Sequence, residues 1–586
     1  MRVLRTILVA LVLAAATFAW LSRDPGPDPT PRLFTAARIL TMEADQPEAT
    51  AVAVRDGRIT AVGSLEEVRA ALGDAAADYA LDERFAGKFV LPGFIDPHLH
   101  PSLGATILPM EIVSAMAWTT PAGRTEAVRG REAFLARLRE LDAAYTARVD
   151  REGWLLVWGY HAPYHGALSR ADLDAVSSAR PILVWQRSVH ELFLNTKALA
   201  ELDLHERDFA AHEQADWETG HIYEGALFTL GAPATRILAA PGRYRRGLAM
   251  MSEVIHRGGL TTVGEQGFPQ VTKLGEWLML WLEMRKRVPY RFVLVPNAMY
   301  LLRKNGDAVA AEREAAGMLA RSSNRIRVVK HAKYYADGAI FSQLMQMREP
   351  YLDGHHGEWM MPPDDQAAVL DAFWREGWGI HIHVNGDAGL DRVLDQIEAQ
   401  QTKHPAPGRR IVLEHYGFAR EDQHARVAAL GIDVSNNPYY PHELAPIYAE
   451  HGLGPERAAE ISPLGGLARA GVPISFHSDF LMAPAEPLLL AWVAVNRIAS
   501  DGRVWGSHQK LPLDLALRAI TIEGARSLGL EDEIGSIRPG KRADFTVLER
   551  DPTAVDPLEL KDIPIWGTVL DGRPHPILAP AAGQTR

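Results

Sequence analysis

Short apolar runs alternate with segments of helical pattern through the middle of the chain. Alternation of this kind is typical of a parallel β-sheet whose strands are joined by helices. Eight runs are expected to form the strands of one main sheet: 89–96, 260–265, 291–295, 326–335, 379–384, 410–415, 432–436 and 472–479. A closed (β/α)8 barrel, or TIM barrel, needs eight parallel strands. The pattern therefore predicts an α/β fold with such a barrel over residues 89–533.

A long connection follows the first predicted strand. It contains two more strand-like runs, at 155–160 and 182–189, before the second strand begins. Loops at the carboxyl ends of barrel strands form the mouth of these barrels and vary most between enzymes. We therefore interpret residues 101–257 as an elaborated insertion at the mouth.

Both ends of the chain carry β-like patterns. An Asp-Gly dipeptide, which tolerates the positive φ angles of a tight hairpin, lies between two β-like runs within 51–62. Two further β-like runs, 543–548 and 565–570, lie close to the carboxyl end. A unit of roughly 60 residues is too small to be very stable alone. The pattern predicts one small β-sandwich domain built from both chain ends, 32–88 and 534–580.

The chain starts with basic residues, followed by an apolar run at 7–21 and a Pro-rich stretch at 23–31. A basic start and a short apolar core are typical of an export signal, and the run is shorter than the roughly 20 residues that span a membrane. Residues 1–22 are therefore predicted to be a cleaved signal peptide or an uncleaved signal-anchor, and 23–31 a linker. We expect an exported protein, either periplasmic or anchored to a membrane through 7–21 and facing outside the cytoplasm.

Composition narrows the chemistry. The formal net charge of -11 and the absence of a long basic run argue against nucleic-acid binding. The chain has no cysteine, which excludes disulfides, thiolate nucleophiles and Cys-ligated zinc. Any metal must be held by histidine, carboxylate or modified lysine. A small-molecule substrate is expected, and the sequence leaves the oligomeric state open.

The strongest local motif is a pair of histidines at the end of the first predicted strand. His98 and His100 are two residues apart, and side chains two apart on an extended strand face the same side. Catalytic groups of barrel enzymes lie at the carboxyl ends of strands. The pair is therefore predicted to share one metal ion rather than to be two surface histidines.

Later strands end in similar residue types. His383, His415 and Asp479 lie at the ends of the fifth, sixth and eighth predicted strands. Each alone would more often be a packed polar residue, but together they supply imidazoles and a carboxylate suited to zinc-like ions. The fourth strand carries Lys330 and Lys333. A buried lysine there needs a lowered pKa or a chemical modification.

With these motifs in order, the chain resembles the amidohydrolase superfamily, specifically its amidohydrolase-3 (YtcJ-like) branch. The resemblance runs from about residue 33 to residue 573. The matching segments are 51–63, 91–100, 190–199, 333–338, 383–387, 414–415, 478–479 and 534–545.

The resemblance implies two divalent metal ions, with zinc as the expected identity. It implies that His98 and His100 bind one ion and that His383 and His415 bind the other. Lys333 would be carboxylated on its amine and bridge both ions. The resemblance favours Lys333 over Lys330 because Lys333 lies four residues before the Asp-Gly pair at 337–338. Asp479 would contact the first ion and act as general acid and base.

Some positions depart from the family pattern or suggest contact with substrate. His477 stands where relatives often have glycine, and strand two ends in Glu265 where a histidine or aspartate was expected. The resemblance suggests that His190 faces the substrate, although a role in stabilising the insertion is as plausible. Tyr439 and Tyr440 follow strand seven and are expected to line the mouth, and Tyr439 and His477 are expected to contact the substrate.

The leading hypothesis is hydrolysis of a non-peptide C–N bond in an amide, an N-acyl compound or a cyclic amide. A hydroxide bridging two cations would attack, because metal binding lowers the pKa of water to about 7, and Asp479 would transfer the proton to the leaving amine. Two alternatives remain open: a catalytically silent, membrane-tethered binding protein, and an isomerase, lyase or esterase that uses the same metal site.

Overall fold

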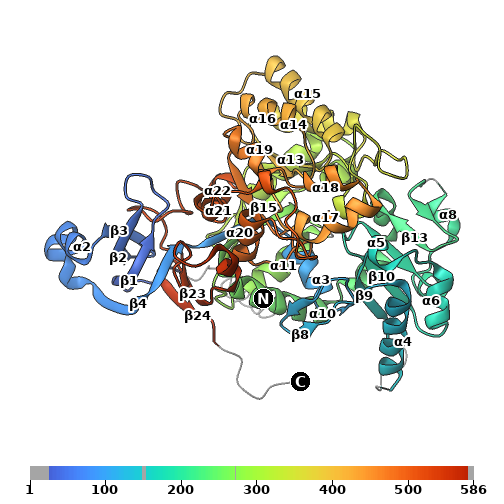
Figure 1. The fold of residues 1–586 in the computed structure, drawn as a ribbon, viewed down its shortest axis with the longest axis horizontal. Coiled ribbons are helices and arrows are strands. Elements are labelled where there is room, and N and C mark those ends of the chain that lie inside the picture. Colours follow the sequence, from blue (N-terminus) through green and yellow to red (C-terminus); the bar gives the residue numbers. More distant parts are fainter. Residues whose placement is uncertain (1–25, 148–152, 211, 271, 579–586) are drawn as a thin grey trace, which may run out of the picture.

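The computed structural model describes residues 26–578 except 148–152, 211 and 271. Within this part, the chain forms a large central α/β unit, an insertion on one side and a small β-sheet on the other (Figure 1). Residues 1–25, which include the predicted signal segment, lie outside the described residues. No helix of the described part is long and apolar enough to cross a membrane.

The central unit contains two sheets of parallel strands. One has four strands in the order β16-β15-β14-β5, and the other has five strands in the order β17-β18-β19-β20-β21. The bounds are β5 Phe94–Leu99, β14 Leu260–Phe268, β15 Arg291–Pro296, β16 Ile326–Val328, β17 His331–Tyr335, β18 Gly379–Val384, β19 Ile411–His415, β20 Asp433–Asn436 and β21 Ile474–Phe476.

All eight predicted runs contain strands. The run 326–335 is divided between β16 and β17, and the run 89–96 covers the end of β4 (Ala80–Pro92) and the start of β5. Every residue of β15 and of β18 is buried. Burial on both faces explains why the sequence shows continuous apolar runs rather than strict alternation of apolar and polar residues.

The two sheets meet at both ends. Asn297, which follows β15, forms a parallel bridge with Lys333 of β17. At the other end, the Asp479 backbone N–H donates to the His98 carbonyl oxygen at 2.9 Å. The second contact brings the carboxyl ends of the first and last strands together, which is where the predicted site residues lie.

Helices pack around the central strands. Their bounds are α10 Pro241–Arg257, α11 Lys273–Met284, α12 Ala298–Asn305, α13 Ala308–Leu319, α14 Pro363–Arg375, α15 Asp387–Lys403, α16 Glu421–Ala429, α17 Tyr440–His451, α18 Pro455–Ala459, α19 Leu464–Arg469, α20 Pro487–Asn496, α21 Leu513–Ala519 and α22 Ile522–Ser527. In α15, for example, Leu390, Val393, Leu394 and Ile397 are buried at the spacing of one helix face.

The segment between β5 and β14 forms a sheet of its own. Its six strands have the order β12-β13-β11-β10-β9-β6. The predicted runs 155–160 and 182–189 contain β9 and β10. Its elements include α3 Pro101–Ile107, β6 Glu111–Ile112, α4 Arg131–Ala147, β9 Leu155–Tyr160, β10 Ile182–Gln186, β11 Glu191–Leu194, β12 Ala215–Asp216, β13 His221–Tyr223, η2 Glu224–Leu230 and α9 Gly231–Leu238.

Both chain ends contribute to one seven-stranded sheet with the order β24-β23-β22-β4-β1-β2-β3. Its other strands are β1 Arg32–Leu40, β2 Glu48–Arg55, β3 Arg58–Gly63, β22 Phe545–Leu548, β23 Ile565–Leu570 and β24 Arg573–Pro576. The two contributions also meet at its edge, because the Ile59 backbone N–H donates to the Lys541 carbonyl oxygen. The predicted union of the two chain ends is present, and the division into a two-sheet sandwich stays a prediction.

Candidate metal centre

The histidine pair lies where β5 ends. His98 is the penultimate residue of the strand and His100 directly follows the strand. Their Nε2 atoms are 3.3 Å apart. Asp479, just beyond β21, completes a cluster, because its Oδ1 is 3.2 Å from His100 Nε2 and 3.7 Å from His98 Nε2. The candidate ligand atoms of these three residues all lie within 4.8 Å of one another. The structure therefore brings together the three residues predicted for the first ion.

The other two predicted histidines lie beside this cluster. The rings of His383 on β18 and His415 on β19 are 4.4 Å apart, and His415 Nδ1 is 3.6 Å from Asp479 Oδ2. His415 and Asp479 have left-handed backbones, with φ angles of 76° and 50°. Such conformations are costly for residues other than glycine and cluster at functional sites.

Burial sets the charge of these imidazoles. It lowers the pKa of His98 and of His383 well below the ordinary value, and the nearby Lys333 ammonium lowers both further. Burial also lowers the pKa of His415, with His383 and His98 adding to the shift. Neutral imidazole is the form that binds a metal ion, so the environment keeps these side chains ready to act as ligands.

Lys333 lies in the middle of β17 and is fully buried. Its Nζ has no hydrogen-bond partner within the described part of the chain. Burial lowers the pKa of the Lys333 amine to about 8, although the Glu414 and Asp479 carboxylates oppose the shift. Burying an amine without a hydrogen-bond partner costs free energy. A bound ligand or a chemical modification of Lys333 would remove this cost. Lys330, by contrast, is exposed.

Two buried glutamates hold the first histidine pair in place. Glu414 Oε2 is 2.8 Å from His98 Nδ1, and Glu265 Oε1 is 3.0 Å from His100 Nδ1. Each carboxylate accepts the ring N–H remote from the cluster, which leaves Nε2 of both rings facing Asp479. Carboxylates in this position orient metal-binding histidines and make them more basic.

Neither glutamate was assigned a role from the sequence. Glu414 precedes His415 in one of the segments that carry the resemblance, and Glu265 ends the second predicted strand. Their positions at strand ends were the signal that could have identified them as site residues. Burial would raise the pKa of Glu414, but the Lys333 charge and the hydrogen bond from His381 outweigh it and hold this pKa at about 2. Glu414 is thus an anion beside the candidate ligands.

His477 lies with the cluster of candidate metal ligands rather than on the wall of the cavity. Its ring centroid is 4.5 Å from that of His98, and its Nδ1 is 2.8 Å from Ser435 Oγ. His98, His415 and His477 form a second group of ligand atoms within 4.8 Å of one another. The Nε2 atom of His477 is buried without a partner in the described structure. This geometry fits a ligand better than the predicted substrate contact.

Of the other two residues predicted to contact substrate, His190 lines the cavity and Tyr439 does not. His190 lines the cavity beside His383, at 6.2 Å between ring centroids, and its Nδ1 is 3.0 Å from Glu224 Oε2. The ring of Tyr439 packs against His442 at 5.0 Å. Its neighbour Tyr440 lines the cavity instead, with its hydroxyl 3.0 Å from His415 Nδ1.

A cavity of about 810 Å³ opens onto these residues. Its wall includes His98, His100, His383, His415 and Asp479. Most of the remaining wall is apolar, and the insertion supplies much of it, including Trp185, Leu192, Leu227, Leu230 and Leu238. A large apolar cavity with a few convergent polar groups is the usual form of a small-molecule site.

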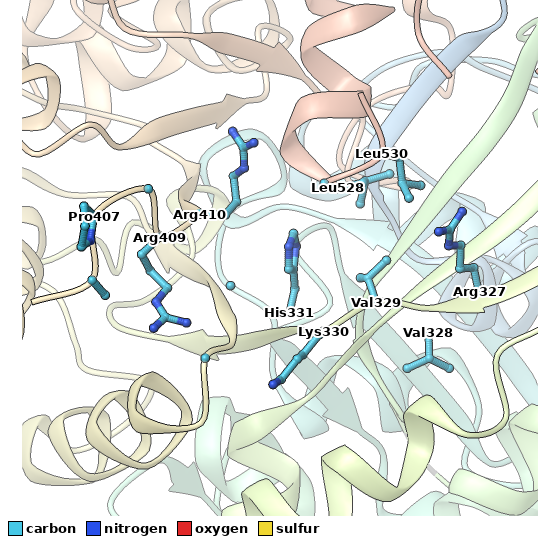
Figure 2. A pocket seen from close by; sticks show the side chains of 15 residues that line it. Arg327, Val328, Val329, Lys330, His331, Pro407, Arg409, Arg410, Leu528 and Leu530 are labelled. Atoms are coloured by element: carbon cyan, nitrogen blue, oxygen red, sulfur yellow. The ribbon is translucent and has the colours of Figure 1, made fainter. Parts of the chain in front are cut away.

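A second cavity, of about 570 Å³, lies at the opposite ends of the strands (Figure 2). Arg327, Lys330, His331, Arg409 and Arg410 surround it, and none of the predicted metal ligands is among its lining residues. We therefore place the reaction in the larger cavity.

A chain of hydrogen bonds nevertheless connects the second cavity to the cluster of candidate metal ligands. His331 Nδ1 is 3.0 Å from His381 Nε2, and His381 Nδ1 is 2.6 Å from Glu414 Oε1. Because Glu414 also contacts His98, the chain runs through the interior of the central unit. It anchors the Glu414 carboxylate on the side remote from the metal ligands.

Comparison with known proteins supports the same class. A model of the amidohydrolase family matches residues 86–575, and a model of a bacterial imidazolonepropionase-like composite domain matches residues 51–75. The chain is 26% identical to an N-substituted formamide deformylase of Arthrobacter pascens, over 92% of this chain and 96% of that protein. It is 24% identical to the amidohydrolase YtcJ of Bacillus subtilis strain 168, over 91% and 97% of the two chains.

Among solved structures, an uncharacterized metal-dependent hydrolase from Pyrococcus horikoshii OT3 has a similar fold. Its TM-score is 0.67 at 20% identity, with 90% of this chain and 99% of that chain covered. The family match covers most of the chain, and the resemblance seen in the sequence is confirmed. The protein is an enzyme of the amidohydrolase family, and its relatives are hydrolases that act on carbon–nitrogen bonds other than peptide bonds.

Proposed function

We propose that the chain uses two divalent metal ions to hydrolyse the C–N bond of a neutral, largely apolar amide. The observation that carries the proposal is the convergence of imidazole and carboxylate ligands from several strand ends around a buried lysine amine without a partner. The described residues fit a metal centre because the donors are those that zinc prefers. Relatives named a formamide deformylase and an amidohydrolase support the bond class.

In this proposal, His98, His100 and Asp479 hold one ion, and His383 and His415 hold the other. His477 is available as a further nitrogen ligand beside His98. When bound, such ions polarise a carbonyl group and make water a nucleophile near neutral pH. Zinc is the proposed metal because the donor set contains no thiolate and is rich in imidazole.

We propose that Lys333 carries a carbamate, which would offer oxygen ligands to the ions. With a pKa near 8, about a tenth of the amine is neutral at pH 7, against well under a thousandth for an ordinary lysine. A neutral amine adds to the carbon of CO₂, forming an N–C bond and releasing one proton. The product is an anion with two oxygen donors, which would remove the cost of an unpartnered buried amine and offer ligands to the ions.

The protein's own groups then handle protons and orientation. Asp479 lies 3.2 Å from His100 and 3.6 Å from His415, between the two predicted ion sites. It takes a proton from the attacking water and delivers it to the leaving nitrogen. Burial would lower the pKa of His190, but the Glu224 carboxylate at its Nδ1 raises it, and the doubly protonated ring donates from Nε2 to the substrate oxygen.

The finer points of architecture and location are part of the same proposal. The contacts at both meeting points of the two parallel sheets support a closed (β/α)8 barrel. The alternation of buried residues in the seven-stranded sheet supports a sandwich-like small domain. The apolar run at 7–21 supports export, with the segment cleaved or kept as an anchor.

The direct test of the proposed reaction is product analysis in water labelled with ¹⁸O. A panel of N-acyl amines, N-substituted formamides and cyclic amides would be incubated with the metal-loaded protein. Hydrolysis predicts one ¹⁸O atom in the carboxylic acid product and release of the free amine. An isomerised or eliminated product without the label, from any substrate that turns over, would contradict the proposal.

The apolar cavity predicts a preference that a substrate series can measure. Each methylene buried contributes about 0.8 kcal/mol, so kcat/KM should rise about three- to fourfold per added carbon until the cavity is filled. A homologous series of N-acyl amines tests this, with the corresponding ω-carboxylate series as the control. A flat series, or a preference for the charged compounds, would contradict the assignment of this cavity.

The role of Glu414 can be measured separately from the reaction. We expect Glu414→Gln to weaken metal binding by about 10- to 100-fold, because the carboxylate that orients His98 is lost. Competition with a chelator measures this change. Glu312→Gln, at a buried glutamate that accepts from the Trp378 indole, is a matched control that should leave the affinity unchanged. Equal affinities in wild type and Glu414→Gln would remove Glu414 from the metal centre.

A further inference from the structure

One helix beside the larger cavity carries an exposed row of leucines. On α11, Leu274, Leu278 and Leu282 are 74%, 45% and 39% exposed, and their spacing of four residues places them on one face. The half-buried Trp277 and Trp281 flank this row. We call the three leucines and two tryptophans the α11 ridge. An apolar row of this kind on a helix surface marks an interaction site.

The charges around the α11 ridge are basic on its exposed side. Both acidic residues of α11, Glu276 and Glu283, are buried. The helix is followed directly by Arg285, Lys286 and Arg287, and the Arg285 guanidinium lies over the Trp281 ring at 5.2 Å. The exposed surface of α11 therefore offers leucine, tryptophan and cationic groups, without an exposed carboxylate of the helix itself.

A neighbouring helix adds to the positive charge. α10 packs against α11 (Figure 1) and carries the exposed residues Arg245 and Arg246 in its first turns. The ion pairs of the described residues include Lys286 with Glu283 and Arg257 with Glu253, but neither Arg245 nor Arg246. The whole chain has a formal net charge of -11, so this concentration of cations is local.

An adjoining face of the same helix, about 100° around from the leucine row, borders the reaction cavity. Gly275, Glu276 and Met279 of α11 are among the residues that line it. The α11 ridge therefore lies on the helix that supplies part of the cavity wall. A surface that contacts the ridge would lie next to the space in which an apolar substrate binds.

We propose that the α11 ridge docks onto the surface of a lipid bilayer that contains anionic lipids. Leucines with flanking tryptophans and basic residues are the composition of helices that lie in the membrane interface. Anionic headgroups complement the cations of α10 and α11. The apolar run at 7–21 belongs to the same chain and is expected to lie at a membrane at some stage. The ridge adds a second contact, which holds the cavity beside the lipid from which apolar molecules enter.

The test exploits the absence of cysteine from the chain. Leu278→Cys in the full chain gives a single thiol for an environment-sensitive fluorophore. Leu352→Cys is the matched control, because Leu352 is 57% exposed and lies beside α17 and α18, where its backbone N–H bonds to the Gly452 carbonyl oxygen. The local probe distinguishes contact by the ridge from attachment through residues 7–21.

Both proteins are mixed with vesicles of phosphatidylcholine and phosphatidylglycerol, with and without brominated acyl chains. We expect a blue shift and severalfold quenching at position 278, little change at 352, and a smaller effect with phosphatidylcholine alone. Equal, unshifted emission at both positions would overturn the proposal. So would a blue shift at 278 that needs no vesicles and grows with protein concentration, because a second copy of the chain would then cover the ridge.

Discussion

Asp479→Asn is expected to lower kcat by roughly a hundred- to ten-thousand-fold while metal content stays close to that of the wild type. The asparagine keeps the size of the side chain and one oxygen near His100 and His415. It cannot accept the proton of the attacking water, and proton transfer by a positioned side chain contributes about this much to the rate.

Steady-state kinetics and elemental analysis of the same preparation check this expectation. Asp501→Asn is the matched control, because Asp501 forms an ion pair with Arg503 in an exposed region. That variant should retain its turnover. Near-normal kcat in Asp479→Asn, with metal bound, would remove Asp479 from proton transfer and leave it as a ligand only.

Lys333→Ala is expected to reduce kcat by more than about a hundredfold, because loss of outer contacts to metal ligands alone costs 10- to 100-fold. Lys333→Arg should not restore turnover, since a guanidinium stays protonated and cannot add to CO₂. Short carboxylic acids such as formate should partly restore Lys333→Ala by supplying the missing oxygen donors.

The neighbouring lysine provides the control for this experiment. Lys330 is exposed and borders the second cavity, so Lys330→Ala should retain full turnover. If Lys333→Arg turned over as fast as the wild type, a carbamate at this position would be ruled out. If Lys330→Ala lost turnover and Lys333→Ala kept it, the functional lysine would be Lys330 and the assignment of Lys333 would be wrong.

The sequence was a good guide to the strands because burial on both faces leaves a visible apolar signature. β15 and β18 were predicted to within a residue for this reason. The run 326–335 gave no sign that it is divided into β16 and β17, because Val329 and Lys330 continue an extended pattern without a turn residue. The hydrogen-bond pairing that separates the two sheets depends on neighbouring strands, which a single run does not encode.

The candidate site was predictable where the chemistry lies at strand ends. His98, His100, His383, His415 and Asp479 all follow this rule, and the structure gathers them on one side of the central unit.

The supporting residues were harder to predict. Glu414 acts through His98, which is 316 residues away in the sequence, so only tertiary structure reveals the contact. His477 was expected to contact the substrate, and the structure places its ring beside that of His98, at 4.5 Å between centroids. Tyr440 rather than Tyr439 lines the cavity, since adjacent residues at the start of α17 point in different directions.

The measurement that tests the central claim most directly is elemental metal analysis of the wild-type protein and of Lys333→Ala. Two divalent ions per chain in the wild type, with a clear fall in the variant, is the result that the two-ion centre predicts. One ion or none in the wild type, unchanged in the variant and unrestored by metal with bicarbonate, would contradict it.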